Sequence, residues 1–512
     1  MSFGGQQMDI LQNLLFGFSV VFTPSNLLLC FAGVFIGTLI GVLPGIGPAG
    51  SVALLLPFTF TLAPVSGIIM LAGIFYGSMY GGSTTSILVN IPGEAASVVT
   101  CLDGYQMARQ GRAGRALGIA AIGSFIAGTF GVILLMLTAP SLARFALNFG
   151  PPEFFALIFL GLTLISYLAA GSMLKAFAMA ALGTIIGTVG IDSVSGSIRF
   201  AFGIKEFYDG LGLVPVVMGL FGVGEVLVNL EESFGERHIF QTKIKGLLPD
   251  RNDWKASSMP IARGTLIGFF LGILPGPGNI ISSFVSYSVE KRFSKHPDDF
   301  GKGAIEGVAG PESANNSATA GAFIPLLTLG IPTSATMALL LGALRIHGVI
   351  PGPLLIERNP EIFWGVISSM YVGNIMLLIL NLPLIGMWVK LLKVPYGILF
   401  PLILLFCLIG VYAANFTLVE INVMIVFGIL GYFMRKAGYE PAPLVFAYIL
   451  CPIWEENLRQ SLMVGYGDIM IFFKRPISAT LLGLSFFFIL TSVLGSAKRR
   501  KLKEAMRGEK AV

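Results

Sequence analysis

Charge is scarce in this sequence. Only 12% of its 512 residues are Asp, Glu, Lys or Arg, whereas 55% are hydrophobic. A soluble domain usually carries about 25% charged residues. The first basic residue is Arg109, and the residues before it contain only three charges, Asp9, Glu94 and Asp103. The polar residues are too few to cover the surface of a water-soluble globule of this size. The apolar excess must therefore face lipid or other buried protein.

Signatures of enzymes are also missing. The sequence has no G-x-x-x-x-G-K-[ST] phosphate-binding loop, no H-E-x-x-H zinc motif and no G-x-S-x-G nucleophile turn. Its three histidines, His238, His296 and His347, lie far apart and lack metal-ligand spacing. No basic stripe is interleaved with aromatic residues, as nucleic-acid binding would require. We therefore expect neither an enzyme nor a nucleic-acid-binding protein, and no cofactor.

Cysteines are few and unpaired. The four cysteines form no CxxC pair, and three of them lie in or beside apolar runs, so we interpret them as small buried hydrophobic residues. The N-terminus lacks the positive segment of a signal peptide, so we expect no cleavage there.

What the sequence does contain is a long series of apolar runs. A helix needs about 20 apolar residues to cross a bilayer. Clear runs occupy 27–43, 66–80, 116–137, 154–170, 174–189, 211–230, 261–274, 363–382, 396–411, 419–433 and 477–494. The 64 glycines and 28 prolines interrupt many of them. Such breaks persist at membrane depth only where the backbone is buried in protein or lines a wet cavity. We predict an all-α polytopic membrane protein of about 10–12 helical segments, some of them broken or re-entrant.

The sequence also repeats itself. Three matches keep their order: GVLPGIG at 41–47 returns as GILPGPG at 272–278, Ile91-Pro92 returns as Ile331-Pro332, and Gly128 returns as Gly373. The offset grows from 231 (272 − 41) through 240 (331 − 91) to 245 (373 − 128), as small insertions would produce. We predict a duplication, with a first membrane repeat in 1–240, a second in 241–480, and the end of the last apolar segment with a basic tail in 481–512.

Charge bias indicates that the two repeats are inverted. Arg109, Arg112 and Arg115 share a loop of the first half, whereas the corresponding loop Glu357–Glu361 has one Arg and two Glu. Basic flanks favour the cytoplasmic side, so equivalent loops would lie on opposite faces. Inverted repeats place a substrate site near the midplane, at discontinuous helices. By the same charge rule, the tail from Lys498 predicts a cytoplasmic C-terminus.

Two polar clusters interrupt the apolar background. They read YGGSTTSILVNIPGE at 80–94 and GPESANNSATAG at 310–321, the second followed by LGIPTS at 329–334. Helix N-termini attract anions, and hydroxyl, amide and unwound carbonyl oxygens bind hard cations. We predict substrate contacts from Gly45, Gly47, Ser83, Thr84, Asn90, Pro92, Gly93, Asn279, Asn315, Asn316, Ser317, Thr319, Pro332, Thr333 and Ser334. For an isolated glycine the alternative role is close helix packing.

Two acidic residues in these clusters are candidates for ion coupling. Glu312 adjoins the asparagine pair of the second cluster, and Glu94 lies at the matching turn of the first half. Ionisable residues in apolar surroundings are functional candidates. Glu312 could bind a coupling proton, or a sodium ion together with Asn90 and Asn316. It could equally be a structural hydrogen-bond acceptor at the start of a helix.

At these residues the sequence resembles the large membrane subunit of the tripartite tricarboxylate transporters, the TctA family. The matching stretches are 41–48, 82–94, 272–278 and the long block 310–353, which contains GPESANN, PLLTLGIP and HGVIPGP. The similarity extends roughly from residue 20 to residue 480. The block in the second half is long and specific, whereas the Pro-Gly-x-Gly runs alone would be weak.

The resemblance implies a multi-pass secondary transporter of the bacterial inner membrane, driven by Na⁺ or H⁺. Its substrates would be citrate-like tricarboxylates or other small carboxylates. A periplasmic solute-binding protein would deliver the solute, and a small four-span membrane subunit would accompany the chain. We expect alternating access as the mechanism. The alternative is a stand-alone ion-coupled carboxylate permease; a channel would not need the duplicated, broken-helix plan, and an intramembrane enzyme would need a paired acid or a nucleophile with its base.

Overall fold

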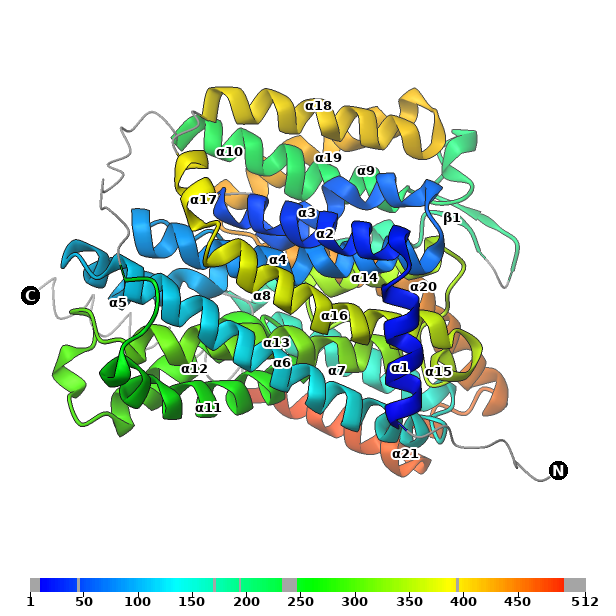
Figure 1. The fold of residues 1–512 in the computed structure, drawn as a ribbon. Helices are drawn as coiled ribbons and strands as arrows, with labels where there is room; N and C mark the ends of the chain where they lie inside the picture. Colours follow the sequence, from blue (N-terminus) through cyan, green and yellow to red (C-terminus); the bar gives the residue numbers. More distant parts are fainter. Residues whose placement is uncertain are drawn as a thin grey trace, which may run out of the picture. The chain divides into compact units, whose positions relative to one another are not determined.

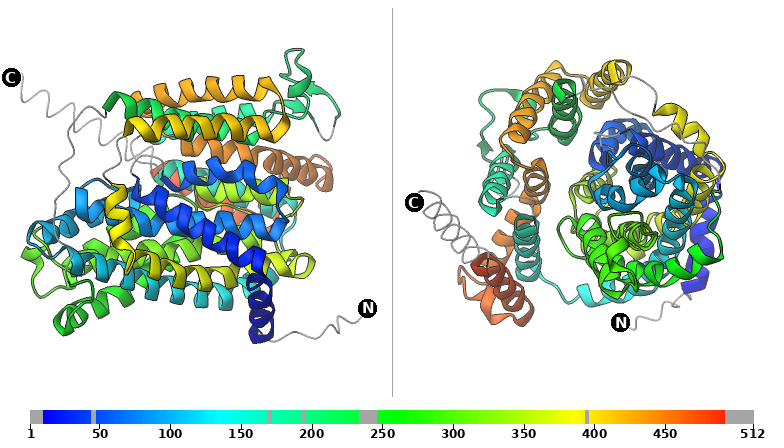
Figure 2. Two further views of the ribbon diagram at one scale, coloured as in Figure 1. Left: turned by 45° about the horizontal axis from the view of Figure 1, so that its top comes forward. Right: turned by 90° about the vertical axis from the view of Figure 1, so that its left-hand side faces the viewer.

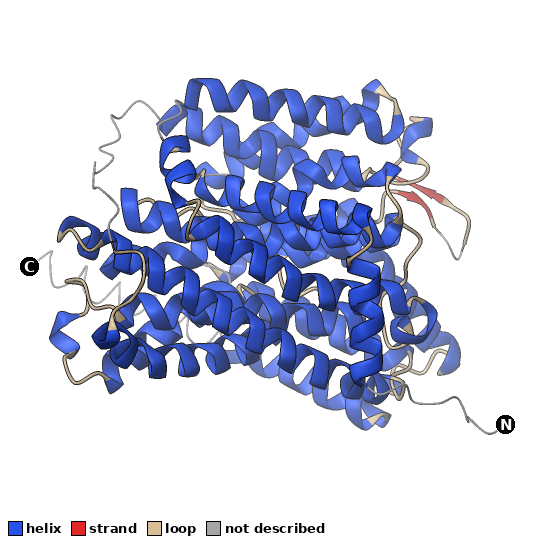
Figure 3. Ribbon diagram, viewed as in Figure 1, coloured by secondary structure: helices blue, strands red, loops and turns tan. Residues whose placement is uncertain are grey.

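The computed structural model describes residues 10–43, 47–168, 172–192, 195–232, 246–392 and 396–491. Gly45 of the predicted site and the basic tail from Lys498 lie outside this part of the chain. The described residues are almost entirely helical, with one short two-stranded sheet (Figure 3). Within the described ranges, seven helices are long and apolar enough to cross a membrane: Pro24–Val42, Pro64–Val89, Ala113–Ala146, Leu213–Glu231, Arg251–Ile273, Pro360–Asn381 and Leu418–Lys436. The predicted all-α polytopic membrane protein is confirmed.

The chain forms two compact units. The first comprises Met1–Ala146, Gly212–Leu274 and Gly278–Arg435, and the second comprises Leu147–Leu211, Pro275–Pro277 and Lys436–Val512. The first unit holds α1 (Ile10–Val21), α2 (Pro24–Val42), α3 (Gly47–Leu55), η1 (Leu56–Thr61), α4 (Pro64–Val89), η2 (Ala95–Ser97), α5 (Val98–Arg109), α6 (Ala113–Ala146), α9 (Leu213–Val217), the π-helix η4 (Met218–Val223), α10 (Gly224–Glu232), α11 (Arg251–Ile273), α12 (Gly278–Phe293), η5 (Pro297–Asp299), α13 (Glu306–Leu329), α14 (Ala335–Ile346), α15 (Leu355–Arg358), α16 (Pro360–Asn381), α17 (Ile385–Leu391), α18 (Tyr396–Asn415) and α19 (Leu418–Lys436) (Figure 1).

Local sequence signals set the ends of several helices. Pro24, Pro64 and Pro360 stand in the first turns of α2, α4 and α16, where a missing N–H breaks no helical hydrogen bond. At their C-terminal ends, α4 meets Asn90 at φ 59° and α13 meets Gly330 at φ 69°. Both residues have the left-handed conformation that closes a helix.

Two glycine rows allow pairs of helices to touch along their backbones. A Cβ at any glycine of the row in α11 would lie within 2.3 Å of a carbonyl oxygen of α13, and in α2 within 2.5 Å of one of α4. The glycines are Gly264, Gly268 and Gly272 facing Gly310, Ala314 and Ala318, and Gly33, Gly37 and Gly41 facing Met70, Ile74 and Ser78. The glycines of the two rows differ by 231 positions (264 − 33), and the carbonyls they face differ by 240 (310 − 70). These are two of the offsets found in the sequence.

Helices α11 and α12 form an antiparallel hairpin. Gly264, Gly268 and Gly272 of α11 face residues of α13 in the same sequence order, so these two helices are parallel. α12 runs the opposite way, because Asn279 near its start bonds to Asn315, whereas Glu290 near its end lies beside Gly310. Glu290 also pairs with Arg263 of α11. The end of α11 and the start of α12 therefore both lie at the level of the middle of α13, because Gly272 faces Ala318 and Asn279 bonds to Asn315.

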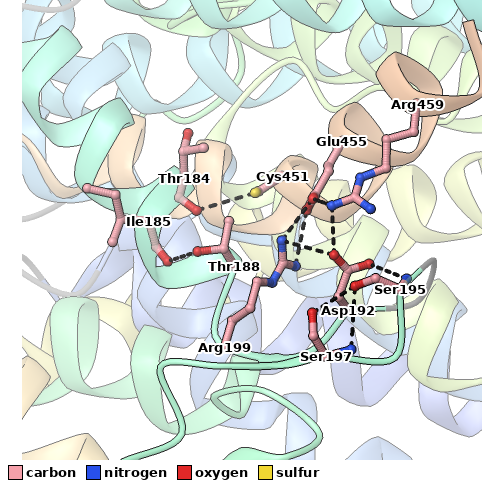
Figure 4. A network of polar contacts seen from close by, with 10 residues as sticks. All are labelled: Thr184, Ile185, Thr188, Asp192, Ser195, Ser197, Arg199, Cys451, Glu455 and Arg459. Atoms are coloured by element: carbon pink, nitrogen blue, oxygen red, sulfur yellow. Dashed lines mark hydrogen bonds and ion pairs between the residues drawn. The ribbon is translucent and has the colours of Figure 1, made fainter. Parts of the chain in front are cut away.

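The second unit contains α7 (Pro151–Leu168), α8 (Met173–Gly187), β1 (Gly190–Ile191), β2 (Ile198–Arg199), η3 (Lys205–Phe207), α20 (Pro441–Val464), α21 (Ile471–Lys474) and the apolar helix Pro476–Thr491. The antiparallel strands pair Gly190 with Arg199 and Ile191 with Ile198. Arg199 then donates two hydrogen bonds, of 2.8 and 3.2 Å, to the carboxylate of Glu455 in α20 (Figure 4). These bonds hold the strand hairpin on α20.

Candidate functional site

A buried carboxylate of α13 lies at the centre of the candidate site. Glu312 is 1% exposed. Ser83 of α4 donates a hydrogen bond of 2.5 Å to its Oε2, and Thr100 of α5 donates one to its Oε1. Helices α4 and α5 therefore meet α13, which lies more than 200 positions later in the sequence, at one acidic side chain. Both of these partners are neutral hydroxyl groups.

A second acidic residue reaches the same helix. Glu94 is 6% exposed and caps η2, with its Oε2 accepting a hydrogen bond of 2.5 Å from the backbone N–H of Ala96. Its Oε1 accepts one of 3.2 Å from Nδ2 of Asn315. Asn315 and Glu312 are three positions apart in α13 and so lie on neighbouring parts of its surface. The two carboxylates thus belong to one polar cluster.

The start of α12 adds amide groups to this cluster. Nδ2 of Asn279, the second residue of α12, donates hydrogen bonds of 3.0 Å to the carbonyl of Asn315 and to Oγ1 of Thr319. The first N–H groups of a helix have no partner within the helix, and the N-terminal end carries partial positive charge. The site can therefore offer N–H donors to an anion beside oxygen ligands for a cation.

Neighbouring positions of α13 face other helices, because successive residues of a helix point in different directions. Asn316 donates a hydrogen bond of 2.8 Å to Oγ of Ser124 in α6, and one of 3.0 Å to the carbonyl of Glu312. Ser317 instead donates to the carbonyl of Thr265 in α11 at 2.7 Å. Asn316 extends the cluster toward α6, whereas Ser317 holds α11 against α13.

The structure brings together seven of the seventeen residues predicted for the site. The cluster contains Ser83, Glu94, Asn279, Glu312, Asn315, Asn316 and Thr319. Asn90 is exposed at the end of α4, so its predicted role as an ion ligand beside Glu312 has no support from burial. Gly93 packs so closely that a Cβ would lie 2.1 Å from the carbonyl oxygen of Gly41.

The remaining predicted residues have local roles or stand apart. Gly47 begins α3, and Ser334 caps α14 by accepting a hydrogen bond of 3.3 Å from the N–H of Met337. Of the other predicted residues, Pro92 is half-buried, whereas Thr84, Pro332 and Thr333 are buried. Both polar clusters lie largely within continuous helices, α4 and α13, and not at breaks. Unwound carbonyls were therefore the wrong expectation for residues 80–89 and 310–321.

Three polar residues at or near the cluster were not predicted. Thr100 and Ser124 are lone hydroxyl residues among apolar ones, and only the packing of α5 and α6 brings them to α13. Asp103, which is fully buried, accepts hydrogen bonds of 2.8–2.9 Å from the backbone N–H groups of Gly301, Gly303 and Ala304. Asp103 thereby fixes the loop that leads into α13. Its only signal was a charge in an almost uncharged segment.

The carboxylates of the second unit differ from those of the cluster. Asp192 and Glu455 are paired with Arg199 and Arg459 (Figure 4). Such ion pairs are complete and structural. Among the described residues, no three His, Cys, Asp or Glu side chains gather as a metal site would require.

Comparisons with known proteins give one family. The model of the tripartite tricarboxylate transporter TctA family matches residues 27–446. The chain is 50% identical, over 496 residues, to an uncharacterized 52.8 kDa protein in the TAR-I ttuC' 3' region of Agrobacterium vitis, covering 97% of this chain and 99% of that protein. It is 51% identical over 234 residues to an uncharacterized protein in the TAR-II ttuC' 3' region of the same organism, covering 46% of this chain and 97% of that protein. No solved structure matches.

Proposed function

Because the chain belongs to the tripartite tricarboxylate transporter TctA family, we propose that it is the large membrane subunit of a secondary transporter for small carboxylates, citrate-like tricarboxylates among them. In this proposal a periplasmic solute-binding protein delivers the substrate, and a small membrane subunit completes the complex in the bacterial inner membrane. A gradient of Na⁺ or H⁺ drives uptake. The C-terminus lies in the cytoplasm, in keeping with its basic residues.

The observation that carries the proposal is the pair of buried carboxylates without a positive partner. In the described contacts, Glu94 and Glu312 bond to hydroxyl, amide and backbone N–H groups and to no Lys or Arg. Burying an ionised carboxylate without a compensating charge costs several kcal/mol. A proton or a sodium ion that binds during the transport cycle would supply that charge. Binding of the cation would also prepare the site for an anionic substrate.

The substrate would bind where N–H donors meet this neutralised pair. Asn279 brings the N-terminal end of α12 against Asn315 and Thr319. A carboxylate is stabilised at such an end by the orphan N–H groups and the helix dipole. This assigns Glu94 and Glu312 to the coupling cation, and Asn279 and Asn315 to the substrate.

Alternating access is supported by the matched organisation of the first unit. The two glycine rows and the left-handed residues Asn90 and Gly330 recur at the offsets found in the sequence. Figure 1 shows α5 at one end of the helices of this unit and α15 at the opposite end, and the left view of Figure 2 agrees with it. Loops at corresponding positions of the two halves would then lie on opposite faces. Inverted repeats can exchange conformations and so open one site to each side in turn.

The test is uptake by proteoliposomes that contain the full chain. We expect uptake of radiolabelled citrate, or of another small carboxylate from a panel, only when the small subunit, the solute-binding protein and an imposed Na⁺ or pH gradient are all present. Full uptake without the two partners would replace the proposal with a stand-alone permease. Non-saturating flux without a gradient would replace it with a channel.

A further inference from the structure

The proposed function assigns no role to a small cavity next to the carboxylate cluster. It has a volume of about 10 Å³ and lies in the first unit, between α4, α6 and α16. A volume of about 10–15 Å³ is the least that holds one water molecule. Its lining residues are Tyr80, Ser83, Thr84, Leu117, Ala120, Ala121, Ser124 and Asn381. The cavity therefore has room for a single small species.

The cavity offers oxygen atoms with free lone pairs. Asn381 is 4% exposed and donates its Nδ2 to the carbonyl of Leu377 at 3.0 Å. Its Oδ1 is buried and has no hydrogen-bond partner among the described residues. Ser83 has already donated its proton to Glu312, so its oxygen can only accept in the cavity. A buried acceptor without a partner costs roughly 1–3 kcal/mol, so an occupant must be a donor or a cation.

Charge favours a cation over water. Ser83 bonds directly to the carboxylate of Glu312, and Ser124 accepts a hydrogen bond from Asn316, which in turn bonds to the carbonyl of Glu312. The cavity thus lies one side chain away from a buried negative group that has no positive partner in the described contacts. The electrostatic attraction of a positive ion to that group is strong at low dielectric constant.

We propose that this cavity binds one dehydrated sodium ion, held by side-chain oxygens of Ser83, Thr84, Ser124 and Asn381. Hydroxyl and amide oxygens can replace the hydration shell of an alkali ion, and a bare sodium ion is smaller than a water molecule. Through Ser83 the ion is linked to Glu312 and through Ser124 to Asn316. Binding of the ion itself does not rest on the proposed function, but its role as the coupling ion does.

The test measures ion binding without transport. The full chain is purified in nanodiscs, and its melting temperature is followed as NaCl replaces choline chloride at constant ionic strength. We expect a saturable rise with Na⁺, because a ligand that binds only the folded state stabilises it. The variants Asn381→Leu, which removes the free oxygen, and Ala120→Val, which fills the cavity, should each weaken the apparent Na⁺ affinity by about tenfold or more.

Asn26→Leu is the matched control. Asn26 is also a buried asparagine that donates Nδ2 to a carbonyl, but it bonds to Ser66, which is 17 positions (83 − 66) from Ser83 in α4. At 1.5 Å per residue this is about 25 Å away, so Asn26→Leu should lower the melting temperature and keep the Na⁺ response. If the wild-type chain melts at the same temperature in both salts, or if both cavity variants keep the wild-type Na⁺ affinity, the cavity holds water only and the inference is overturned.

The two proposals fail separately. Na⁺ binding that follows the cavity variants supports the ion site even if no carboxylate is taken up by proteoliposomes. Uptake that needs a pH gradient, with no Na⁺ response of the melting temperature, overturns the ion site and leaves the transport function intact.

Discussion

Glu312 is the residue whose environment is hardest to explain by stability alone. Ser83 and Thr100 are its side-chain partners, and neither carries a charge. One of these hydroxyls can donate to the amide oxygen of a glutamine and the other can accept from its NH2 group, so Glu312→Gln should keep the fold while removing the charge that binds a cation. We expect uptake by Glu312→Gln to fall to less than about a tenth of the wild-type rate, corresponding to more than 1.4 kcal/mol. Radiolabelled uptake, normalised to protein in the membrane, measures it.

Glu306→Gln is the control for this prediction. Glu306 lies two turns of α13 earlier and is half-buried at the surface, where it lines an open pocket with Arg112 and Lys302. Its neutralisation should leave uptake near the wild-type rate. Unchanged uptake by Glu312→Gln would remove Glu312 from the coupling mechanism and leave it the structural acceptor that the sequence also allowed.

At the scale of elements, the glycine rows determine how closely α11 and α13 approach. A Cβ at Gly268 would lie 2.1 Å from the carbonyl oxygen of Ala314. A backbone carbonyl within a helix cannot move aside as a side chain can, so Gly268→Ala should force the two helices apart. We expect a loss of about 1–3 kcal/mol in stability, measured by thermal or denaturant unfolding in nanodiscs.

The matched control is Gly386→Ala in α17. No atom lies within 4 Å of a Cβ at Gly386. Because alanine favours a helix over glycine by about 1 kcal/mol, this variant should be neutral or stabilising. Equal stability of Gly268→Ala and Gly386→Ala would show that the close approach of α11 and α13 is not needed for the fold.

The strand hairpin of the second unit depends on a different interaction. Glu455 accepts hydrogen bonds from both Arg199 and Arg459 with its side chain about a quarter exposed. Glu455→Gln removes one of the two carboxylates that pair with both arginines, the other being Asp192, so the hairpin should separate from α20 more often. We expect a loss of about 1 kcal/mol and faster cleavage of the segment 195–204 by limited proteolysis.

Lys474→Ala is the comparison for this hairpin. Lys474 pairs with Asp468, but its side chain is 68% exposed, and exposed ion pairs contribute about 0–1 kcal/mol. Its removal should leave the cleavage rate of the hairpin unchanged. If Glu455→Gln is cleaved no faster than Lys474→Ala, the hairpin is held on α20 by other contacts.

At the scale of the whole molecule, hydropathy and glycine spacing predict more of the fold than the positions of polar residues predict of the site. Apolar runs predicted the membrane class, and the second copy of the repeated Leu-Pro-Gly run lies at the break between α11 and α12. The sequence also identified Glu312 and Asn315, because polar residues in an apolar background are conspicuous. It did not identify Thr100, Ser124 or Asn381. A lone hydroxyl or amide residue acquires a role only when packing sets another helix against it.

The role of Asn90 as an ion ligand with Glu312 and Asn316 remains a prediction, and the structure shows Asn90 exposed at the end of α4. An asparagine in a polar cluster can cap a helix or bind a ligand, and only its backbone conformation, φ 59°, identifies the cap. The division of the chain into two sequence repeats remains a prediction. The compact units are assembled from non-contiguous segments, and no hydropathy pattern separates such segments.

If the two sequence repeats are inverted, as we propose, corresponding loops lie on opposite faces of the membrane. Gln110, in the basic turn between α5 and α6, and Glu357, in α15, are both exposed and occupy corresponding loops of the two halves. In a chain whose four native cysteines are replaced by serine or alanine, Gln110→Cys should react with a membrane-impermeant maleimide only in inside-out vesicles, because positive loops stay in the cytoplasm. Glu357→Cys should react only in intact cells with a permeabilised outer membrane. A variant that keeps Cys30, which is buried, as its single cysteine is the control that should not be labelled. Labelling of both positions from the same side would mean parallel repeats, and the two halves could then not open one site to opposite faces by exchanging conformations.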